Sequence, residues 1–321
     1  KNETLILGGE GILGLEAACA SLTEPGDRVL VLDNGVFGKG FADFVRIYGG
    51  EPVLYTTDYR HTLDVDALAA FLEKDHDFKY ATVVHCDTPS GMLNDISRIC
   101  PLLNSWGILT VVDSVSAMFG EEVRVDDFCI DLLCGGSQKA VSAPPGLTFV
   151  TISPAAWKTM KERRTPIASF YANLLAFDGY FEKQWFPYTM PISDIRGLRA
   201  AFENIQADSD MLLRHARIAR AVRTALTSCG LRLHTRDGWS NTVSVFDVPA
   251  GTTASAILTA LREDHNLMLA GSFDVLEGQV IRIGHMGENA REEKLAAVMK
   301  ALDAVFAKLG VILNGSLEEV Y

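Results

Sequence analysis

At 321 residues the chain is longer than one ordinary hydrophobic core supports, so two domains are expected. Its formal net charge of -12 at pH 7 argues against nucleic acid and against anionic membrane surfaces as partners, because both require a positive protein surface. No apolar run reaches the length of a membrane-spanning helix. The six scattered cysteines form no CxxC pair and no histidine stands at metal-ligand spacing, which predicts reduced thiols, no metal site and a cytoplasmic protein.

The first motif along the chain is a glycine-rich turn. A short strand is predicted at Thr4–Leu7 so close to Lys1 that a preceding segment is expected. Gly9 to Gly14 then spells G-x-G-x-x-G at the start of a helix predicted over Ile12–Leu22. This spacing leaves an NAD-dependent Rossmann enzyme as a lower alternative. In either case, the amides at this helix N-terminus are suited to bind an anion.

Apolar strands and helices then alternate along the chain. Strands are predicted at residues 28–32, 52–55, 80–85, 108–113, 131–134 and 146–152, and helices near 41–48, 65–73 and 96–106. This alternation predicts an α/β fold, with a largely parallel sheet sandwiched by helices. The last of these strands follows Pro144-Pro145-Gly146, and we expect it to form an antiparallel edge.

Two residues at the carboxyl ends of successive strands point to chemistry. Asp113 ends one buried strand, and Lys139 follows the next one in the run Ser137-Gln138-Lys139. Parallel sheets place their active sites at this edge. Removing water around a lysine disfavours its charged form and makes the amine nucleophilic. A reactive lysine and an aspartate that pairs a ring nitrogen are the groups that pyridoxal chemistry requires.

The remaining chain predicts a second, smaller domain. A helix at Ile192–Gln206 leads out of the large domain, which we place at residues 1–207. Residues 208–321 are predicted as an α+β domain with helices at 210–229, 254–265 and 290–309 and strands at 231–235, 242–248 and 279–283. The polar tail from Asn314 is expected to fray.

Several motifs together resemble one enzyme family. Asp113-Ser-Val-Ser116, Gly136-Ser-Gln-Lys139, Ala143-Pro-Pro-Gly146 and Arg282-Ile-Gly284 resemble the class V, fold type I pyridoxal phosphate-dependent aminotransferases, specifically the alanine–glyoxylate (serine–pyruvate) group. The resemblance implies an enzyme that moves an amino group between a small amino acid and a small 2-oxo acid through a lysine-bound pyridoxal 5'-phosphate aldimine. It also implies a homodimer with the active site near the subunit interface.

The resemblance assigns roles to individual residues. Lys139 and Asp113 are the expected catalytic residues, and Arg282 is the expected clamp for the substrate carboxylate. The remaining expected cofactor-binding residues are Glu10, Gly11, Ile12, Phe37, Thr88, Gln138 and, reaching the neighbouring subunit, Thr189. For three of these positions a purely structural role stays open. Phe37 would then pack in the core, Thr88 would cap a turn, and the aromatic segment around Thr189 would pack at an interface without contacting the cofactor.

Glu10 opens a second functional interpretation. A carboxylate in the phosphate-binding turn repels a phosphate, and together with Leu13–Ala18 and Asp87–Gly91 it resembles the pyridoxamine–pyruvate aminotransferases. These enzymes use unphosphorylated pyridoxal or pyridoxamine as a substrate. Glu10 pointing away from the turn is the alternative that would leave the amides free for phosphate. A non-enzymatic vitamin-binding protein is disfavoured, because Lys139, Asp113 and Arg282 occur together.

Overall fold

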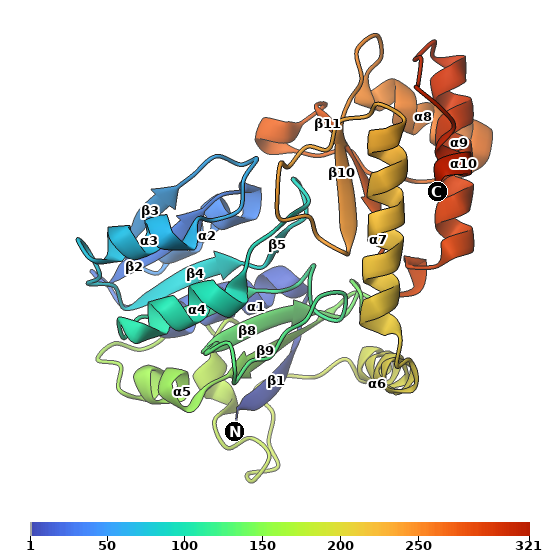
Figure 1. The fold of residues 1–321 in the computed structure, drawn as a ribbon. Coiled ribbons are helices and arrows are strands. Elements are labelled where there is room, and N and C mark those ends of the chain that lie inside the picture. Colours follow the sequence, from blue (N-terminus) through green and yellow to red (C-terminus); the bar gives the residue numbers. More distant parts are fainter. Residues whose placement is uncertain (1) are drawn as a thin grey trace.

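The computed structural model describes residues 2–321, and a seven-stranded sheet forms its centre (Figure 1). Four successive pairs in the order β8-β7-β4-β2-β3 are parallel, as predicted. The seven strands, in their order across the sheet, are β1 (Glu3–Gly8), β9 (Leu147–Ile152), β8 (Leu132–Gly136), β7 (Leu109–Asp113), β4 (Tyr80–Val84), β2 (Arg28–Asp33) and β3 (Glu51–Thr56).

The predicted edge strand β9 is antiparallel, but it does not lie at the edge. It pairs antiparallel with β8 on one side and with β1 on the other. Leu5 and Leu7 of β1 are buried, so β1 covers an apolar strand that would otherwise face solvent. Because β1 lies at the sheet edge beside an antiparallel strand, its glycine turn lacks the parallel neighbours of a dinucleotide-binding unit. The Rossmann alternative is therefore disfavoured.

Helices cover both faces of the sheet. The hydrophobic cluster on one face includes side chains of α1 (Gly11–Leu22), α2 (Val36–Ile47) and α5 (Pro154–Lys161). The cluster on the other face includes α3 (Val65–Leu72) and α4 (Ile96–Ser105). These two layers bury the strands on both faces, which is why the strand sequences are continuous runs of apolar residues.

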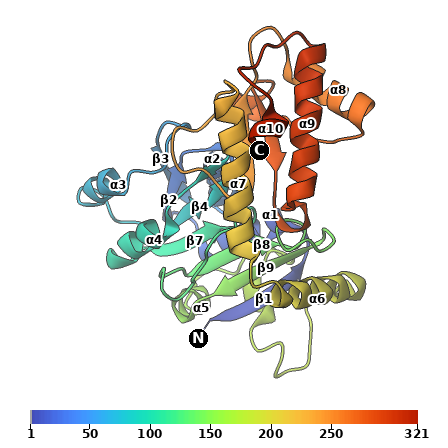
Figure 2. The same ribbon diagram turned by 45° about the vertical axis from the view of Figure 1, so that its right-hand side comes forward.

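The C-terminal part has its own hydrophobic core. It follows the linking helix α6 (Ile192–Ala207) and contains α7 (Met211–Ser228), β10 (Val243–Asp247), α8 (Ala254–His265), β11 (Val280–Gly284), α9 (Glu292–Lys308) and α10 (Leu317–Val320). Strands β10 and β11 form an antiparallel pair. Figure 1 and Figure 2 show α7 and α9 side by side above the sheet. Across residues 2–321, no helix combines the length and hydropathy that crossing a membrane requires.

Three local predictions are wrong. Residues 231–235 form no strand, and only Leu233 makes an isolated bridge, to Phe246. Helix α2 begins at Val36, five residues before the predicted start at Phe41, because distant groups stabilise its first turn. The tail does not fray: Leu317 is buried, and Asp303 accepts hydrogen bonds from the backbone of residues 317 and 318.

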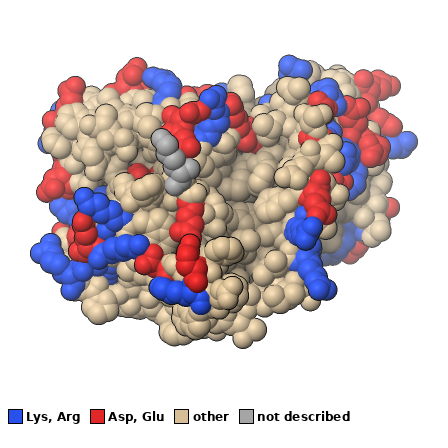
Figure 3. Space-filling view, turned by 90° about the horizontal axis from the view of Figure 1, so that it is seen from below, with Lys and Arg blue, Asp and Glu red and all other residues tan. Residues whose placement is uncertain are grey.

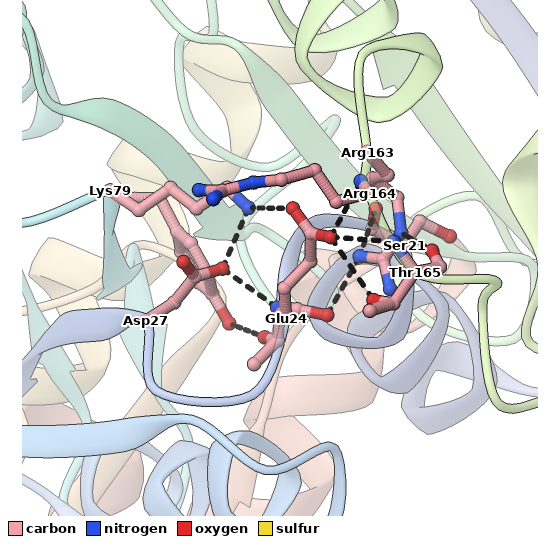
Figure 4. A network of polar contacts seen from close by, with 9 residues as sticks. Ser21, Glu24, Asp27, Lys79, Arg163, Arg164 and Thr165 are labelled. Carbon is pink, nitrogen blue, oxygen red and sulfur yellow. Dashed lines mark hydrogen bonds and ion pairs between the residues drawn. The ribbon is translucent and has the colours of Figure 1, made fainter.

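The partly buried carboxylate of Glu24 ties the turn after α1 to two distant segments (Figure 4). Glu24 accepts hydrogen bonds from the amides of Arg164 and Thr165 at 2.8 and 2.9 Å and from Lys79 Nζ at 3.2 Å. Burial raises the pKa of Glu24, but these hydrogen bonds outweigh it and lower the pKa to about 2. The network lies where β2 and β4 begin, so it holds the sheet at the edge opposite the strands' carboxyl ends.

Candidate functional site

A small cavity of about 120 Å³ opens at the carboxyl ends of the parallel strands. Eight predicted site residues line it, and they come from segments far apart in the chain: Glu10, Gly11, Ile12, Phe37, Thr88, Asp113, Gln138 and Lys139. Four further lining residues were not predicted as site residues: Leu15, Cys86, Val115 and Ser116. The parallel sheet brings these segments together, because it places the loops after successive strands along one edge.

Asp113 is the last residue of β7 and is almost fully buried. Its Oδ1 accepts a hydrogen bond from the amide of Val115 at 2.9 Å. Burial raises the pKa of Asp113, and the nearby carboxylates of Asp87 and Glu10 raise it further, against the opposing effects of Val115 and Lys139. The resulting pKa is about 6. A partly desolvated carboxylate of this kind is stabilised by any cation that it meets in the cavity.

Lys139, the basic residue of the cavity, lies in the turn between β8 and β9. The turn is closed by hydrogen bonds from Ser142 N to Lys139 O at 2.9 Å and from Ala143 N to Ser137 O at 2.9 Å. The Lys139 side chain is half-buried rather than enclosed. Beside it, Gln138 carries a buried Oε1 atom without a hydrogen-bond partner in residues 2–321. An uncompensated polar atom in a cavity marks a place where a polar ligand would be bound.

The N-terminus of α1 approaches this edge closely because Gly11 has no side chain. A Cβ atom at Gly11 would lie 2.8 Å from Cγ2 of Val115, so any larger residue would push the helix away from the Asp113 loop. Glu10 caps the helix: its Oε1 accepts a hydrogen bond from the amide of Ile12 at 3.2 Å. The Glu10 carboxylate therefore occupies one of the amides, that of Ile12, that would otherwise be free for an anion.

Two further predicted residues form the side of the cavity. Phe37 lies in the first turn of α2, and its ring meets that of Phe273 edge to face, with centroids 5.8 Å apart. Phe37 also packs against the core of the large domain, as the alternative interpretation expects, and its contact with a cofactor stays a prediction. The hydroxyls of Thr88 and Ser116 lie 2.8 Å apart. Ser116 stands in the quoted Asp113-Ser-Val-Ser116 motif, and that motif was the signal for it.

Arg282 and Thr189 do not line the cavity itself. Arg282 lies on β11 near the ring of Phe273, which contacts Phe37, and its Nε donates to the carbonyl of Gly271 at 2.5 Å. Burial lowers the pKa of Arg282, and the negative charge of Asp87 partly offsets this effect. Thr189 is exposed and is absent from the cavity lining. Its predicted cofactor contact therefore requires a neighbouring subunit and stays a prediction.

The arrangement suits one kind of ligand. An amine, a carboxylate and an aromatic ring that line the same cavity fit a flat heteroaromatic ring that carries a basic nitrogen and a reactive carbonyl carbon. The carboxylate would hold a proton on the ring nitrogen, and the amine would bond to the carbonyl carbon. Pyridoxal has these groups. The cavity residues thus fit the ring of vitamin B6, whereas the Glu10 carboxylate at the N-terminus of α1 is unfavourable for an anion such as a phosphate group.

Comparisons with known proteins agree with this interpretation. The family model described as aminotransferase class V matches residues 14–272. A pyridoxamine–pyruvate transaminase of Mesorhizobium japonicum is 33% identical over 96% of this chain and 80% of the relative. A serine–glyoxylate aminotransferase of Arabidopsis thaliana is 31% identical over 92% of this chain and 75% of the relative.

A solved structure is similar as well. The crystal structure of pyridoxamine-pyruvate aminotransferase from Mesorhizobium loti superposes with a TM-score of 0.95 at 32% identity, over 100% of this chain and 83% of that chain. The fold predicted from the sequence, fold type I with a largely parallel sheet between helices, is confirmed by such neighbours.

Proposed function

The chain belongs to the class V aminotransferases, which depend on pyridoxal phosphate, and we propose that it transfers an amino group between a small amino acid and a small 2-oxo acid. Relatives named for serine, alanine and aspartate with glyoxylate support this substrate class. The observation that carries the proposal is the placement of Lys139 and Asp113 in one cavity, at the carboxyl ends of neighbouring strands.

Each of three residues has a distinct task in this reaction. Lys139 would bind the cofactor through Nζ and then carry the proton that leaves the substrate α-carbon. Asp113 would keep the proton on the ring nitrogen, because its carboxylate is the buried anion of the cavity. Arg282 would bind the substrate carboxylate through its guanidinium fork. The bound cofactor supplies a ring that withdraws electrons from the substrate.

The test is the mass of the purified protein after mild borohydride reduction, which fixes whatever Lys139 carries. We expect a phosphopyridoxyl group on the peptide that contains Lys139. An unmodified protein that turns over pyridoxamine with pyruvate would contradict the phosphorylated cofactor.

A second candidate function is supported by the position of Glu10. Its side chain points to the helix N-terminus and occupies the amide of Ile12, where a phosphate would otherwise be held. Glu10 is also one of the residues that line the cavity, and its carboxylate contributes to the raised pKa of Asp113. A chain with this feature is suited to unphosphorylated pyridoxal or pyridoxamine as a substrate, and the Mesorhizobium relatives are named for pyridoxamine and pyruvate.

Replacing Glu10 with serine is expected to tighten pyridoxal phosphate binding at least tenfold, because it removes a negative charge from the phosphate end. The dissociation constant of pyridoxal, which has no phosphate, should change less than threefold. Both constants are measured by absorbance titration of the protein freed of vitamin B6. Glu73→Ser is the control, since it makes the same change at the exposed end of α3. Equal effects on both ligands would show that Glu10 does not oppose the phosphate.

Arg282→Lys is expected to raise the KM for carboxylate substrates at least tenfold although the charge is kept. An ammonium group cannot form the planar pair of hydrogen bonds that a guanidinium makes with a carboxylate. Steady-state kinetics with pyruvate as the varied substrate measure the effect. Arg199→Lys, on the exposed face of α6, is the control. An unchanged KM would remove Arg282 from the substrate-binding role.

The active unit that we propose is a homodimer. Large aromatic side chains are exposed on the segment between α5 and α6, a pattern that is typical of protein interfaces. They are Phe170, Tyr171, Phe181, Trp185 and Phe186, with exposed fractions of 53–78%. Figure 3, which views the molecule from below, shows wide stretches without charged side chains on this side. The partner subunit would cover the segment, and Thr189 would reach the partner's cofactor site.

A charge placed on the exposed aromatic segment tests the dimer. Phe181→Glu is expected to shift the protein to monomers in analytical ultracentrifugation and to lower activity in parallel, because a charge would be buried in the interface. Met268→Glu is the control, since Met268 is a similarly exposed apolar residue in the C-terminal part. A fully active monomer would exclude an active site shared between subunits.

A further inference from the structure

Asp87 is a buried carboxylate at the edge of the site, and the proposed reaction gives it no task. It ends the short strand β5 (Cys86–Asp87), which pairs with β6 (Met92–Leu93), and none of its surface is exposed. Its Oδ1 accepts a hydrogen bond from the amide of Phe37 at 3.0 Å. Its Oδ2 accepts from the hydroxyl and the amide of Ser90 at 2.6 and 3.3 Å. A buried carboxylate with this many donors is held in one orientation.

The bond to Phe37 replaces a missing helix cap. Gly35 is the N-cap residue of α2 and has no side chain to accept a hydrogen bond from the first turn. Asp87 supplies the acceptor from a strand fifty residues further along the chain. Its carboxylate fits there only because Gly35 lacks a Cβ, which would lie 2.4 Å from Asp87 Cγ. The position of Phe37 therefore depends on Asp87.

Phe37 connects this cap to the substrate-binding side. Its ring contacts the ring of Phe273, and the guanidinium carbon of Arg282 lies 5.9 Å from the centre of the Phe273 ring. The Arg282 and Asp87 charges are close enough to act on each other's pKa, lowering that of Asp87 against the larger effect of its burial. In addition, the hydroxyl of Ser272 donates to the carbonyl of Pro89 at 3.5 Å. The segment around Ser272 thus contacts the loop that follows Asp87.

We propose that Asp87 is a positioning residue: by capping α2 it fixes Phe37, and through Phe37 and Phe273 it orients Arg282 toward the substrate carboxylate. The inference rests on the proposed function, since it assigns Arg282 to substrate binding. Its action runs through hydrogen bonds and packing rather than through charge. An uncharged acceptor of the same shape should therefore serve.

The first test compares Asp87→Ala with Asp87→Asn. Alanine removes the acceptor, so the KM for pyruvate is expected to rise about tenfold while kcat changes less than threefold. Asparagine keeps an oxygen that accepts from Phe37, so its KM should stay within threefold of the wild type. A residue that only stabilised the fold would lower the active fraction, and with it the apparent kcat, without moving KM.

A pair of glycine variants tests the same contact without touching Asp87. Gly35→Ala places a methyl group against the carboxylate and should raise KM as Asp87→Ala does. Gly40→Ala, in the same helix and with no atom near the added methyl group, should leave KM unchanged. This pair keeps the inference testable if Asp87→Ala fails to fold.

A double-mutant cycle examines whether the effect passes through Arg282. If it does, Asp87→Ala combined with Arg282→Lys should raise KM no more than Arg282→Lys alone. Additive effects, or an unchanged KM in both Asp87→Ala and Gly35→Ala, would overturn the inference. Pyruvate binding is also measured by fluorescence titration. A wild type that binds pyruvate but transfers no amino group would defeat the proposed function, and the variants' dissociation constants would still decide the role of Asp87.

Discussion

Replacing Lys139 with alanine is expected to abolish amino-group transfer and the visible absorbance of the lysine-bound cofactor. The reason is chemical, because no other lysine lines the cavity in residues 2–321 and the reaction needs an amine at this point. Folding should be retained, since Lys139 is only half-buried and lies in a turn whose hydrogen bonds use backbone atoms. Absorbance spectra, turnover and thermal unfolding of the variant measure the three effects.

Two variants show whether the amine or only its charge matters. Lys139→Arg keeps the positive charge but has no reactive amine, so it should be as inactive as the alanine variant. Lys158→Ala removes an exposed lysine of α5 and should behave like the wild type. Turnover by Lys139→Ala at the wild-type rate would remove Lys139 from its proposed role.

Replacing Asp113 with alanine is expected to lower the rate constant of transfer at least a hundredfold, which corresponds to about 2.7 kcal/mol. The variant should still bind the cofactor through Lys139, but nothing would hold the proton on the ring nitrogen. Single-turnover kinetics measure this rate constant apart from substrate binding. Asp131→Ala is a matched control, because Asp131 is also a buried carboxylate of this sheet but bonds to Ser153 and Thr110 outside the cavity. It should lower stability without a hundredfold loss of rate.

The raised pKa of Asp113 adds a pH dependence to this prediction. Only the ionised carboxylate attracts a protonated ring, so cofactor affinity of the protein freed of vitamin B6 should fall as pH decreases through about 6. The sign for folding is opposite: the buried acid costs stability when ionised, so protonation of Asp113 stabilises the free protein. Asp113→Asn should remove this step from the affinity profile. A profile that is the same for Asp113→Asn and wild type would contradict the pairing of Asp113 with the ring.

Much of the cavity could be predicted from the sequence. Asp113 ends a buried strand, Thr88 and Lys139 follow buried strands, and a parallel sheet places such residues along one edge. The direction of the Glu10 side chain could not be predicted, because a carboxylate beside a helix start can turn to the amides or to solvent. Val115 was missed as a lining residue, since an apolar residue in a loop carries no chemical signal until Gly11 is seen to approach it.

Local elements with their own signals were determined by the sequence. Helix α8 has the predicted bounds Ala254–His265, and α3 begins at the predicted Val65, directly after Asp64, whose carboxylate accepts hydrogen bonds from the amides of residues 66 and 67. Helix caps and apolar periodicity depend on residues within the same segment, so they can be recognised from the sequence of that segment alone.

The tertiary structure decided the features that depend on partners far away in the chain. Helix α2 begins at Val36 because Asp87 caps it, β9 lies inside the sheet because β1 pairs with its free side, and residues 231–235 form no strand although their pattern favours one. Hydrogen bonds between distant segments form only when the whole chain packs. Local propensity contributes less free energy than such contacts, so the contacts decide the structure where the two disagree.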